Sequence, residues 1–547
     1  MCGWICSRGR TGREQGSDSI AWPARPRLQV LALLVLGLFA GCARSPETPE
    51  SVLRLSQRNE PAVLDPALAT LPDEFFVLRA LLEGLLAPDP AGGEPRPAAA
   101  ERWTVSPDGR TYTFFLRTDR RWSNGEPVTA ADFVASYQRA LTPATAAPKV
   151  KVFFLVDGAE AYYRGELTDF AATGFAAPDP QTLVIRLTRP APQFPAYVAS
   201  GPWLPVNPRV VARHGSDWTR PGTFVGNGPF TLEEWRPQQR LLVRRRTGEP
   251  VAADVHVDAL AFLAMDNGDT EERAFRAGQI DVTMGVPASK LAGYEAAADP
   301  RLRRAPLHET RYLTFNTRRA PLSDARVRRA LCLALDREAL VTRVVLGGQR
   351  VAHTFVPPGL GGHRPPPSEV RFDPDEARRL LADAGFPAGR GFPRLELATW
   401  TNPAVAEALQ AMWKRELGIE IAIGQREARV HLAALASGDY DLGFMTAIPD
   451  VADPADLLGN LRTGAPANYP QWHDAGYDAA LDHAAAATTA SERLERLAAA
   501  ETRLLAQRPV SPLYFNTRNF LVSPRVSDWH EDALWNRFYG GVRLRAP

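Results

Sequence analysis

One cysteine and one carboxylate stand where chemistry is expected in this chain. Cys42 directly follows Ala-Gly at the end of an apolar run, 28–39, that is preceded by arginines. The run is shorter than the about 20 apolar residues that a transmembrane helix needs, and its flanks are those of a secretory signal. A cysteine after Ala-Gly is where a bacterial lipoprotein signal is cut, and its thiol then carries lipid. An ordinary signal peptide with a chance cysteine is the alternative, and both place the later chain outside the cytoplasm.

The carboxylate is Asp450, which follows a series of alternating strands and helices. The pattern predicts strands at 395–400, 419–423 and 440–444, and helices at 402–418 and 426–436. Such a β-α-β-α-β series implies a mostly parallel sheet covered by helices. Ligands bind beyond the carboxyl ends of the strands of such sheets. Asp450 ends the segment AIPD that follows the third strand, so we predict that it is a ligand-binding residue.

Neither a catalytic nor a metal-binding pattern accompanies these residues. The sequence contains no HExxH, no GxSxG and no P-loop motif, and its nine histidines are scattered. His473 and His483 flank a predicted helix start and are interpreted as solvated polar positions. The segment GNG at 226–228 lacks the third glycine of a dinucleotide loop and is interpreted as a turn. We therefore expect no enzyme activity, no metal and no cofactor.

Composition narrows the class of protein further. The 547 residues are 45% hydrophobic and 23% charged, which is ordinary for globular domains, and the length favours two to four of them. The basic residues are almost all arginines spread among acids, so no nucleic-acid-binding face is indicated. Two of the four cysteines precede the apolar run, which leaves Cys42 for lipid and Cys332 alone. No internal disulfide can form in the mature chain, and Cys332 is predicted to be a buried apolar side chain.

Other local patterns predict the elements that must position Asp450. Strands are expected at 111–116, 183–187 and 312–315, and helices are expected to begin at Thr129, Ser323, Asp336 and Asp373. Thr129 and Asp132 have the spacing of a capping box, and Asp373 precedes a proline at the first helical position.

Several segments, taken in order, resemble the oligopeptide-binding proteins of bacterial ABC importers, within the peptide/nickel class of extracellular solute-binding proteins. They are EPAVLDP (60–66), AERW (100–103), WSNGEPVTAADF (122–133), NGPF (227–230) and RVRRALCLALDR (326–337). The resemblance implies an α/β, two-lobed clamshell like the periplasmic binding proteins, with an additional inserted domain and a hinge. The implied parts are a signal peptide (1–41), a lipidated tether (42–50), lobe I (51–82, 199–308 and 506–547), an inserted domain (83–198) and lobe II (309–505).

The resemblance also implies how a ligand is held. In this family an extended peptide binds by main-chain hydrogen bonds to protein strands, and a carboxylate meets its amino terminus. The Asp-x-x-x-Pro pattern of that carboxylate matches DVADP, which again selects Asp450. A helix N-cap before Pro454 is the alternative role for Asp450, and ordinary packing is the alternative for the other implied residues. By this alignment Thr70 and Leu71 run beside the peptide, and the cleft is lined by Tyr312, Thr314, Tyr514, Thr446 and Ile448.

The resulting hypothesis is a monomeric, lipid-anchored receptor, periplasmic or at the cell surface, that captures oligopeptides. It would deliver them to an ABC permease and its ATPase subunits. A receptor of the same fold for dipeptides, murein peptides, haem or a nickel chelate stays open, as does a secreted enzyme or a chaperone-like envelope protein. The chain departs from the family at three places: Ala447 replaces a tryptophan, Phe444 replaces a basic residue, and RTGEP (246–250) replaces an asparagine-proline-aromatic-tryptophan signature. These departures leave the preferred peptide length and side chains open.

Overall fold

The structure is a computed structural model that describes residues 50–367 and 370–545. The predicted signal peptide, Cys42 and most of the predicted tether lie outside the described residues. Within these two ranges, no helix is both long and apolar enough to cross a membrane.

A four-stranded sheet with the order β1-β10-β9-β8 gathers segments that are far apart in sequence. β1 pairs in parallel with β10, and Leu55 of β1 also bridges Val282, which in turn bridges Val522. The beginning, the middle and the end of the described chain therefore meet in one body. Its strands are β1 (Val52–Gln57), β8 (Phe230–Arg236), β9 (Arg240–Arg245) and β10 (Ala259–Ala264), and the neighbouring helices are α2 (Pro72–Leu81), α7 (Gly268–Arg276) and α8 (Ala288–Ala296).

A second four-stranded sheet, all antiparallel, has the order β4-β5-β7-β6. Its buried side chains belong to the same hydrophobic cluster as most of the buried side chains of the first sheet. Trp122, Tyr137 and Trp203 are among the largest fully buried side chains of that cluster. The strands are β4 (Ala100–Val105), β5 (Thr111–Leu116), β6 (Phe175–Asp179) and β7 (Thr182–Arg186), and the helices are α3 (Ala130–Leu141), α4 (Ala159–Tyr163), α5 (Phe194–Val198) and α6 (Pro208–His214). The expected inserted domain thus shares its core with the expected lobe I, and the exact domain boundaries stay a prediction.

The third sheet has six strands in the order β12-β16-β11-β15-β13-β14. β13 pairs in parallel with both β14 and β15, which confirms the direction predicted from the β-α-β-α-β series. The sheet as a whole is mixed and not mostly parallel, because β11, β12 and β16 come from outside that series and pair antiparallel. The strands are β11 (Leu302–Phe315), β12 (Arg350–Val351), β13 (Leu395–Thr399), β14 (Ile421–Gln425), β15 (Leu442–Ala447) and β16 (Val510–Leu521).

Helices cover both faces of this six-stranded sheet. Successive residues of β11 point to opposite faces, and Leu313 and Tyr312 accordingly belong to two different hydrophobic clusters. The first cluster includes α9 (Ala325–Leu333), α11 (Pro374–Asp383) and α12 (Pro403–Leu417), and the second includes α14 (Pro454–Gly459), α15 (Ala475–Ala486) and α16 (Ala490–Gln507). Cys332 of α9 is buried in the first cluster, as predicted. The helix predicted from Asp336 is split into α10 (Arg337–Leu340) and a π-helical turn (Val341–Val345), and α13 is Ala428–Ser437.

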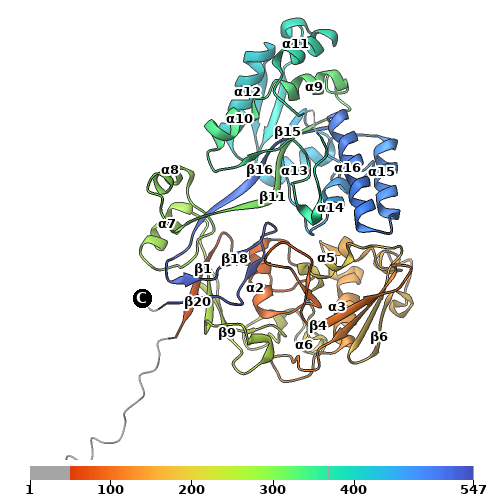
Figure 1. The fold of residues 1–547 in the computed structure, drawn as a ribbon, viewed down its shortest axis with the longest axis vertical. Helices are drawn as coiled ribbons and strands as arrows, with labels where there is room; N and C mark the ends of the chain where they lie inside the picture. Colours follow the sequence, from red (N-terminus) through yellow and green to blue (C-terminus); the bar gives the residue numbers. More distant parts are fainter. Residues whose placement is uncertain (1–49, 368–369, 546–547) are drawn as a thin grey trace, which may run out of the picture. The chain divides into compact units, whose positions relative to one another are not determined.

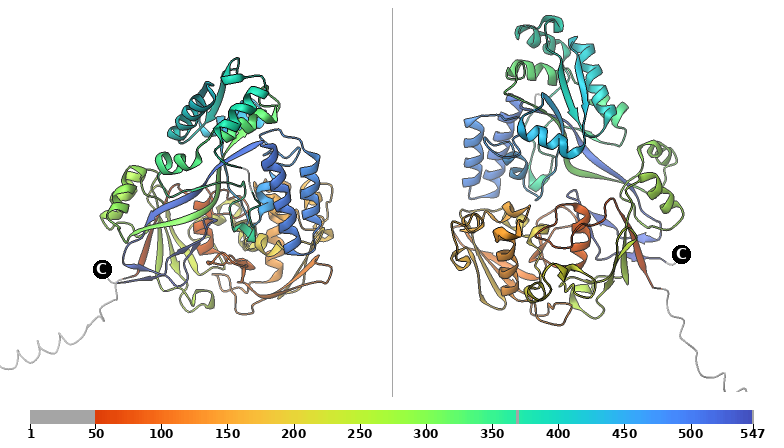
Figure 2. Two further views of the ribbon diagram at one scale, coloured as in Figure 1. Left: turned by 45° about the horizontal axis from the view of Figure 1, so that its top comes forward. Right: turned by 180° about the vertical axis from the view of Figure 1, so that it is seen from behind.

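The long strands β11 and β16 connect the two regions of the described chain. They lie antiparallel side by side over most of their length, as the green and blue arrows of Figures 1 and 2 show. At one end Leu302 and Leu521 pack with residues of α7, and at the other end Leu313 and Leu513 join the core of the six-stranded sheet. Both regions are therefore built partly on the same two strands.

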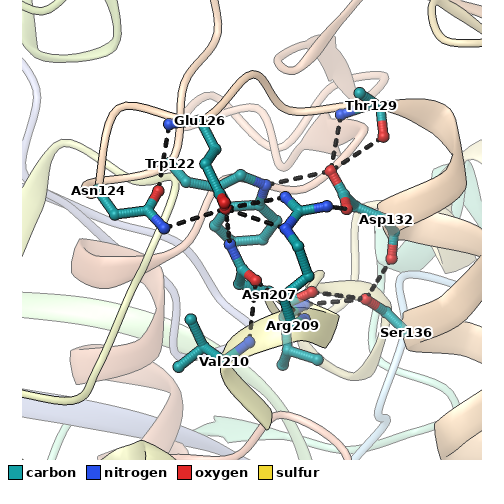
Figure 3. A network of polar contacts seen from close by, with 10 residues as sticks. Trp122, Asn124, Glu126, Thr129, Asp132, Ser136, Asn207, Arg209 and Val210 are labelled. Atoms are coloured by element: carbon teal, nitrogen blue, oxygen red, sulfur yellow. Dashed lines mark hydrogen bonds and ion pairs between the residues drawn. The ribbon is translucent and has the colours of Figure 1, made fainter. Parts of the chain in front are cut away.

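The densest motif of the sequence, 122–133, forms a polar network at the start of α3 (Figure 3). The carboxylate of Asp132, which is 2% exposed, accepts hydrogen bonds from the Trp122 Nε1–H (3.1 Å) and from the N–H (2.9 Å) and hydroxyl (3.0 Å) of Thr129. Arg209 of α6 pairs with both Asp132 and Glu126. These contacts confirm the predicted capping box and tie α3 to α6. The motif is structural here, and none of these residues lines the cavity described below.

The segment GNGPF, 226–230, has an equally structural role. The buried Asn227 side chain accepts from the Glu83 N–H (2.9 Å) and donates to the Glu83 carbonyl (2.8 Å). A Cβ at Gly226 would lie 2.1 Å from the Leu81 carbonyl oxygen, so only glycine fits beside this backbone. The predicted turn before β8 is confirmed, and it holds the end of α2 in place.

We predict that Asp132→Ala lowers the free energy of unfolding by about 2–3 kcal/mol, because it leaves the donors of the buried Trp122 and the partly buried Thr129 without an acceptor. Urea denaturation followed by tryptophan fluorescence measures the change. Asp119→Ala is the control, since Asp119 is half-exposed and pairs with the neighbouring Arg120, and we expect a loss under about 1 kcal/mol. Equal losses in the two variants would contradict the role assigned to Asp132.

Candidate functional site

A cavity of about 1460 Å³ lies at the carboxyl ends of β13 and β15. Thr401 and Asn402, which follow β13, line it, as do Ile448 and Asp450, which follow β15. The chain changes direction across the sheet at β13, because β14 lies on one side of β13 and β15 on the other. This is the place where open α/β sheets bind ligands, and it confirms that Asp450 lies at such a sheet end. The opposite wall is formed by residues from α2, the 88–95 loop, Lys149 and the 192–202 segment.

Five of the residues that the resemblance implied line this cavity. They are Thr70, Leu71, Thr446, Ile448 and Asp450. Leu71 is 44% exposed and Ile448 is 53% exposed, which is unusual for large apolar side chains. Both side chains can therefore make apolar contacts with a molecule in the cavity.

The N–H groups of Thr70 and Leu71 already have a partner. Both donate to Oε2 of Glu74, at 2.7 Å and 2.9 Å, and so form the cap of α2. A ligand main chain that ran beside this segment would therefore meet carbonyl oxygens and side chains. In the sequence, the spacing of Leu71 and Glu74 was the one sign that these N–H groups are used in a helix cap.

Three implied residues do not line the cavity, and the expectation that they do is corrected. Tyr312 is 5% exposed and packs edge-on against Phe355. Thr314 is fully buried and shares a hydrogen bond of 3.2 Å with the Tyr440 hydroxyl. Tyr514 is 1% exposed in the core of the six-stranded sheet. Tyr312 and Thr314 lie in β11, part of which was predicted as a strand, and Tyr514 lies in β16, which was not predicted. The sheet and its helices cover all three side chains.

Asp450 forms an ion pair that joins two walls of the cavity. Its side chain is 47% exposed and forms an ion pair with Nζ of Lys149, which reaches it from the opposite wall and lies 5.7 Å from the centre of the Phe75 ring. The alternative role as a helix N-cap is excluded, because Asp453 caps α14 by accepting from the Ala455 N–H at 3.0 Å. Lys149 was missed in the sequence, since it is 301 residues from its partner, and the rarity of lysine in this chain was its one signal.

Further contacts join the same two walls next to Asp450. Asp453 pairs with Arg493 at 2.7 Å and accepts from the Tyr197 hydroxyl at 3.3 Å. Arg189 donates to the Ala485 carbonyl at 2.9 Å. Together with Lys149, Tyr197 and Arg189 connect the 143–198 part of the chain to α14 and α15 across the edge of the cavity.

Asp456 lies directly beneath Asp450 and accepts from the Asp450 N–H at 2.6 Å. Burial, and next the negative charge of Asp450, raise the pKa of Asp456 to about 7. The carboxyl at this position therefore titrates near neutral pH, and its protonation changes the charge next to Asp450. Within the described residues, no group of three or more histidine, cysteine or acidic side chains is arranged to hold a metal ion.

The raised pKa of Asp456 predicts a pH dependence of stability. Because the folded state binds this proton more tightly than the unfolded state, the free energy of unfolding should fall as the pH rises from about 4 to about 7. Asp456→Asn should remove this part of the slope. Urea denaturation at a series of pH values measures it, with Asp375→Asn, a change at a 97% exposed side chain, as the control. Identical slopes in wild type and Asp456→Asn would contradict the assignment.

Comparisons with known proteins agree with this architecture. The model of the bacterial extracellular solute-binding proteins, family 5 (middle part), matches residues 94–469. The probable deoxycholate-binding periplasmic protein YgiS of Escherichia coli is 32% identical over 498 residues, which cover 88% of this chain and 91% of that protein. The periplasmic murein peptide-binding protein MppA of E. coli is 31% identical over 496 residues, 88% of this chain and 91% of the relative.

Solved structures show the same two-lobed fold. The murein tripeptide-binding protein MppA of E. coli superposes with a TM-score of 0.78 at 29% identity. The superposed part covers 91% of this chain and 99% of the MppA chain. The oligopeptide-binding protein OppA of Haemophilus influenzae, in complex with the peptide RPPGFSPFR, gives a TM-score of 0.74 at 26% identity, with coverages of 91% and 99%. These relatives are binding proteins. The chain thus has the α/β two-lobed clamshell fold of the periplasmic peptide-binding proteins and belongs to the family 5 bacterial extracellular solute-binding proteins.

Proposed function

We propose that this protein is the substrate-binding subunit of an ABC importer and that it captures extended peptides with a free amino terminus in the cavity beside β13 and β15. The observation that carries the proposal is the half-exposed carboxylate of Asp450 inside a cavity of peptide size. Lys149 supports the assignment, because its side chain brings a primary ammonium group to this carboxylate. A peptide α-ammonium group has the same charge and the same donors, and can take this place.

The exchange of Lys149 for a ligand amine is energetically accessible. Ion pairs between side chains as exposed as these contribute only about 0–1 kcal/mol. A ligand that closes the cavity removes water from Asp450 and so strengthens the new pair. The peptide chain would then run past Thr446 and Ile448 on one wall and past Thr70 and Leu71 on the other. Ala447, where relatives carry a tryptophan by the resemblance, leaves room for large ligand side chains.

A second candidate ligand is a carboxylated amphipathic molecule, such as the deoxycholate after which one relative is named. Leu71, Leu432 and Ile448 are exposed apolar side chains that line the cavity, and Lys149 neutralises Asp450. A rigid apolar ligand without an amine would suit that arrangement. Substitution of Asp450 should therefore leave the affinity for such a ligand unchanged, whereas it should weaken peptides with a free amino terminus.

Two substitutions test the amine site in opposite directions. Asp450→Asn should weaken peptides with a free amino terminus by about 100-fold or more, because a desolvated ammonium group loses its partner, and should change N-acetylated peptides little. Lys149→Met should strengthen free-amine peptides by up to about fivefold, since the competing internal cation is gone. Isothermal titration calorimetry with matched free and acetylated peptides measures both. Equal losses for the two peptide forms in Asp450→Asn would refute the assignment.

The proposal includes the cellular position and the parts of the chain. Signal cleavage before Cys42 and lipidation of its thiol would hold a monomeric receptor at the membrane next to its permease and ATPase subunits. Lobe I (51–82, 199–308 and 506–547) and the inserted domain (83–198) would close against lobe II (309–505) around the bound ligand. The relatives named above are periplasmic proteins, which supports a place outside the cytoplasm.

Cys42→Ser should release the protein from the membrane fraction, because one lipid-modified residue is the proposed anchor. Fractionation of cells that express the full chain, followed by immunoblotting, measures the distribution. Cys332→Ser is the matched control and should leave the protein in the membrane fraction, since that thiol is buried. Unchanged membrane association of Cys42→Ser would remove the lipoprotein assignment.

A further inference from the structure

Arg311 is a residue of β11, which lies between β15 and β16 in the six-stranded sheet. Its register partners are Thr446 of β15 and Tyr514 of β16. The β11–β16 ladder is irregular on both sides of this position, with shifts between Pro306 and Thr310 and between Arg311 and Tyr312. Such irregularities re-aim side chains and are common beside functional sites. Arg311 itself lines the cavity.

The charge of Arg311 has no counter-ion in the described part of the chain. Three other basic residues of the cavity wall are paired: Lys149 with Asp450, Arg493 with Asp453 at 2.7 Å, and Arg518 with Glu531. No carboxylate of residues 50–367 and 370–545 lies within 4.0 Å of the Arg311 guanidinium group, and its buried Nε–H has no acceptor there. Arg58 and Arg79 of the wall also lack an ion pair with a described carboxylate. Arg58 is exposed to water, and Arg79 donates to the Ala199 carbonyl at 3.2 Å.

The acid closest to Arg311 along the strand is engaged elsewhere. Glu309, two residues earlier on the same face of β11, accepts from Trp535 Nε1–H at 2.6 Å and from the Asn516 amide at 2.8 Å. Each of its oxygens thus has a neutral donor. Leaving a guanidinium group partly buried and unpaired is costly, and the cost is relieved when an anion enters the cavity.

Neutral donors adjoin the same position. Burial raises the pKa of Tyr514, while the positive charge of Arg311 and a hydrogen bond with the Asn402 side chain act in the opposite direction on its hydroxyl. Asn402 lines the cavity. A planar guanidinium fork beside an amide group matches the two oxygens of a carboxylate.

We propose that Arg311 binds a carboxylate group of the ligand, so that the cavity selects peptides that carry a free carboxylate at a limited distance from the amino terminus. This rests on the proposed peptide-binding function. Thr446, the partner of Arg311, precedes Asp450 by four residues, so the two positions lie within about 20 Å of backbone. An extended peptide of up to about six residues spans that distance. The carboxylate is therefore the C-terminal group of a short peptide or an acidic side chain of a longer one.

Two peptide series distinguish these sources. The first consists of alanine peptides of three to six residues, each as the free acid and as the C-terminal amide. The second consists of amidated octa-alanine peptides with glutamate or glutamine at each position in turn. We expect wild type to prefer one carboxylate-bearing peptide over its neutral counterpart by about 10- to 100-fold. Titration calorimetry measures the affinities.

Arg311→Gln should remove that preference, so that the carboxylate-bearing peptide and its neutral counterpart bind about equally. The affinity for the neutral counterpart should match that of wild type, which also shows that the variant is folded. Arg311→Lys should keep part of the preference, because it retains the charge and loses the fork. Arg319→Gln is the matched control outside the cavity, where Arg319 pairs with Asp439 and Asp441, and should behave as wild type.

The outcomes separate this inference from the proposed function. If wild type binds peptides and shows no carboxylate preference, or if Arg311→Gln keeps the preference, the role of Arg311 is overturned and peptide binding stands. If wild type binds no peptide of either series, the peptide function fails, and the carboxylate subsite fails with it.

Discussion

The antiparallel pairing of β11 with β16 is the constraint on which the remaining architecture depends. Leu302 pairs with Leu521 at one end of this ladder and Thr314 with Val510 at the other. One end packs with α7 and the other lies in the six-stranded sheet. Residues between these ends, including Glu309, Arg311 and Asn516, line the cavity. The same two strands therefore connect the lobes and provide part of the cavity wall.

Arginine fixes this ladder to the neighbouring helices. Arg328 of α9 donates to the carbonyl oxygens of Gln507 and Arg508, at 2.7 Å and 3.1 Å, just before β16 begins. Arg337 donates to the Pro512 carbonyl at 2.7 Å and to the Ser511 hydroxyl at 2.8 Å inside β16. Both side chains are about 4% exposed, and backbone oxygens satisfy several of their donors. The motif 326–337, which helped to indicate the family, thus acts by positioning β16.

Local sequence patterns predicted the elements with independent signals. Asn402-Pro403 and Gly418 bound α12 as expected. The strand before Asp450 was found from its apolar run, although it was predicted at 440–444 and spans Leu442–Ala447. β11 was predicted only at 312–315, because Arg303, Arg304 and Pro306 break the alternation in its first half. Its extension follows from pairing with β16, which is a tertiary effect that propensity does not contain.

The composition of the cavity was harder to predict than the fold, for a physical reason. Tyr312 and Thr314 were placed in the correct strand and no strand was predicted around Tyr514. Which face of a mixed sheet is covered depends on helices distant in the sequence. Lys149 and Asp450 meet across 301 residues. Arg311 is notable because it is partly buried in the cavity wall, its Nε–H has no acceptor, and no described acid pairs with it. Unpaired charge is a property of the folded arrangement and leaves no mark in the sequence.

The motifs that indicate the family and the residues that line the cavity are separate in this molecule. Asp132, Asn227, Arg328 and Arg337 are buried, satisfy backbone or side-chain donors and acceptors, and lie away from the cavity wall. Substitution there would cost stability in any member of the fold, whatever its ligand. Lys149 and Arg311 line the cavity, and Ala447 lies between Thr446 and Ile448, which line it too. Membership of the family therefore specifies the clamshell fold, while the ligand-selecting role proposed for Asp450, Lys149 and Arg311 depends on cavity residues outside those motifs.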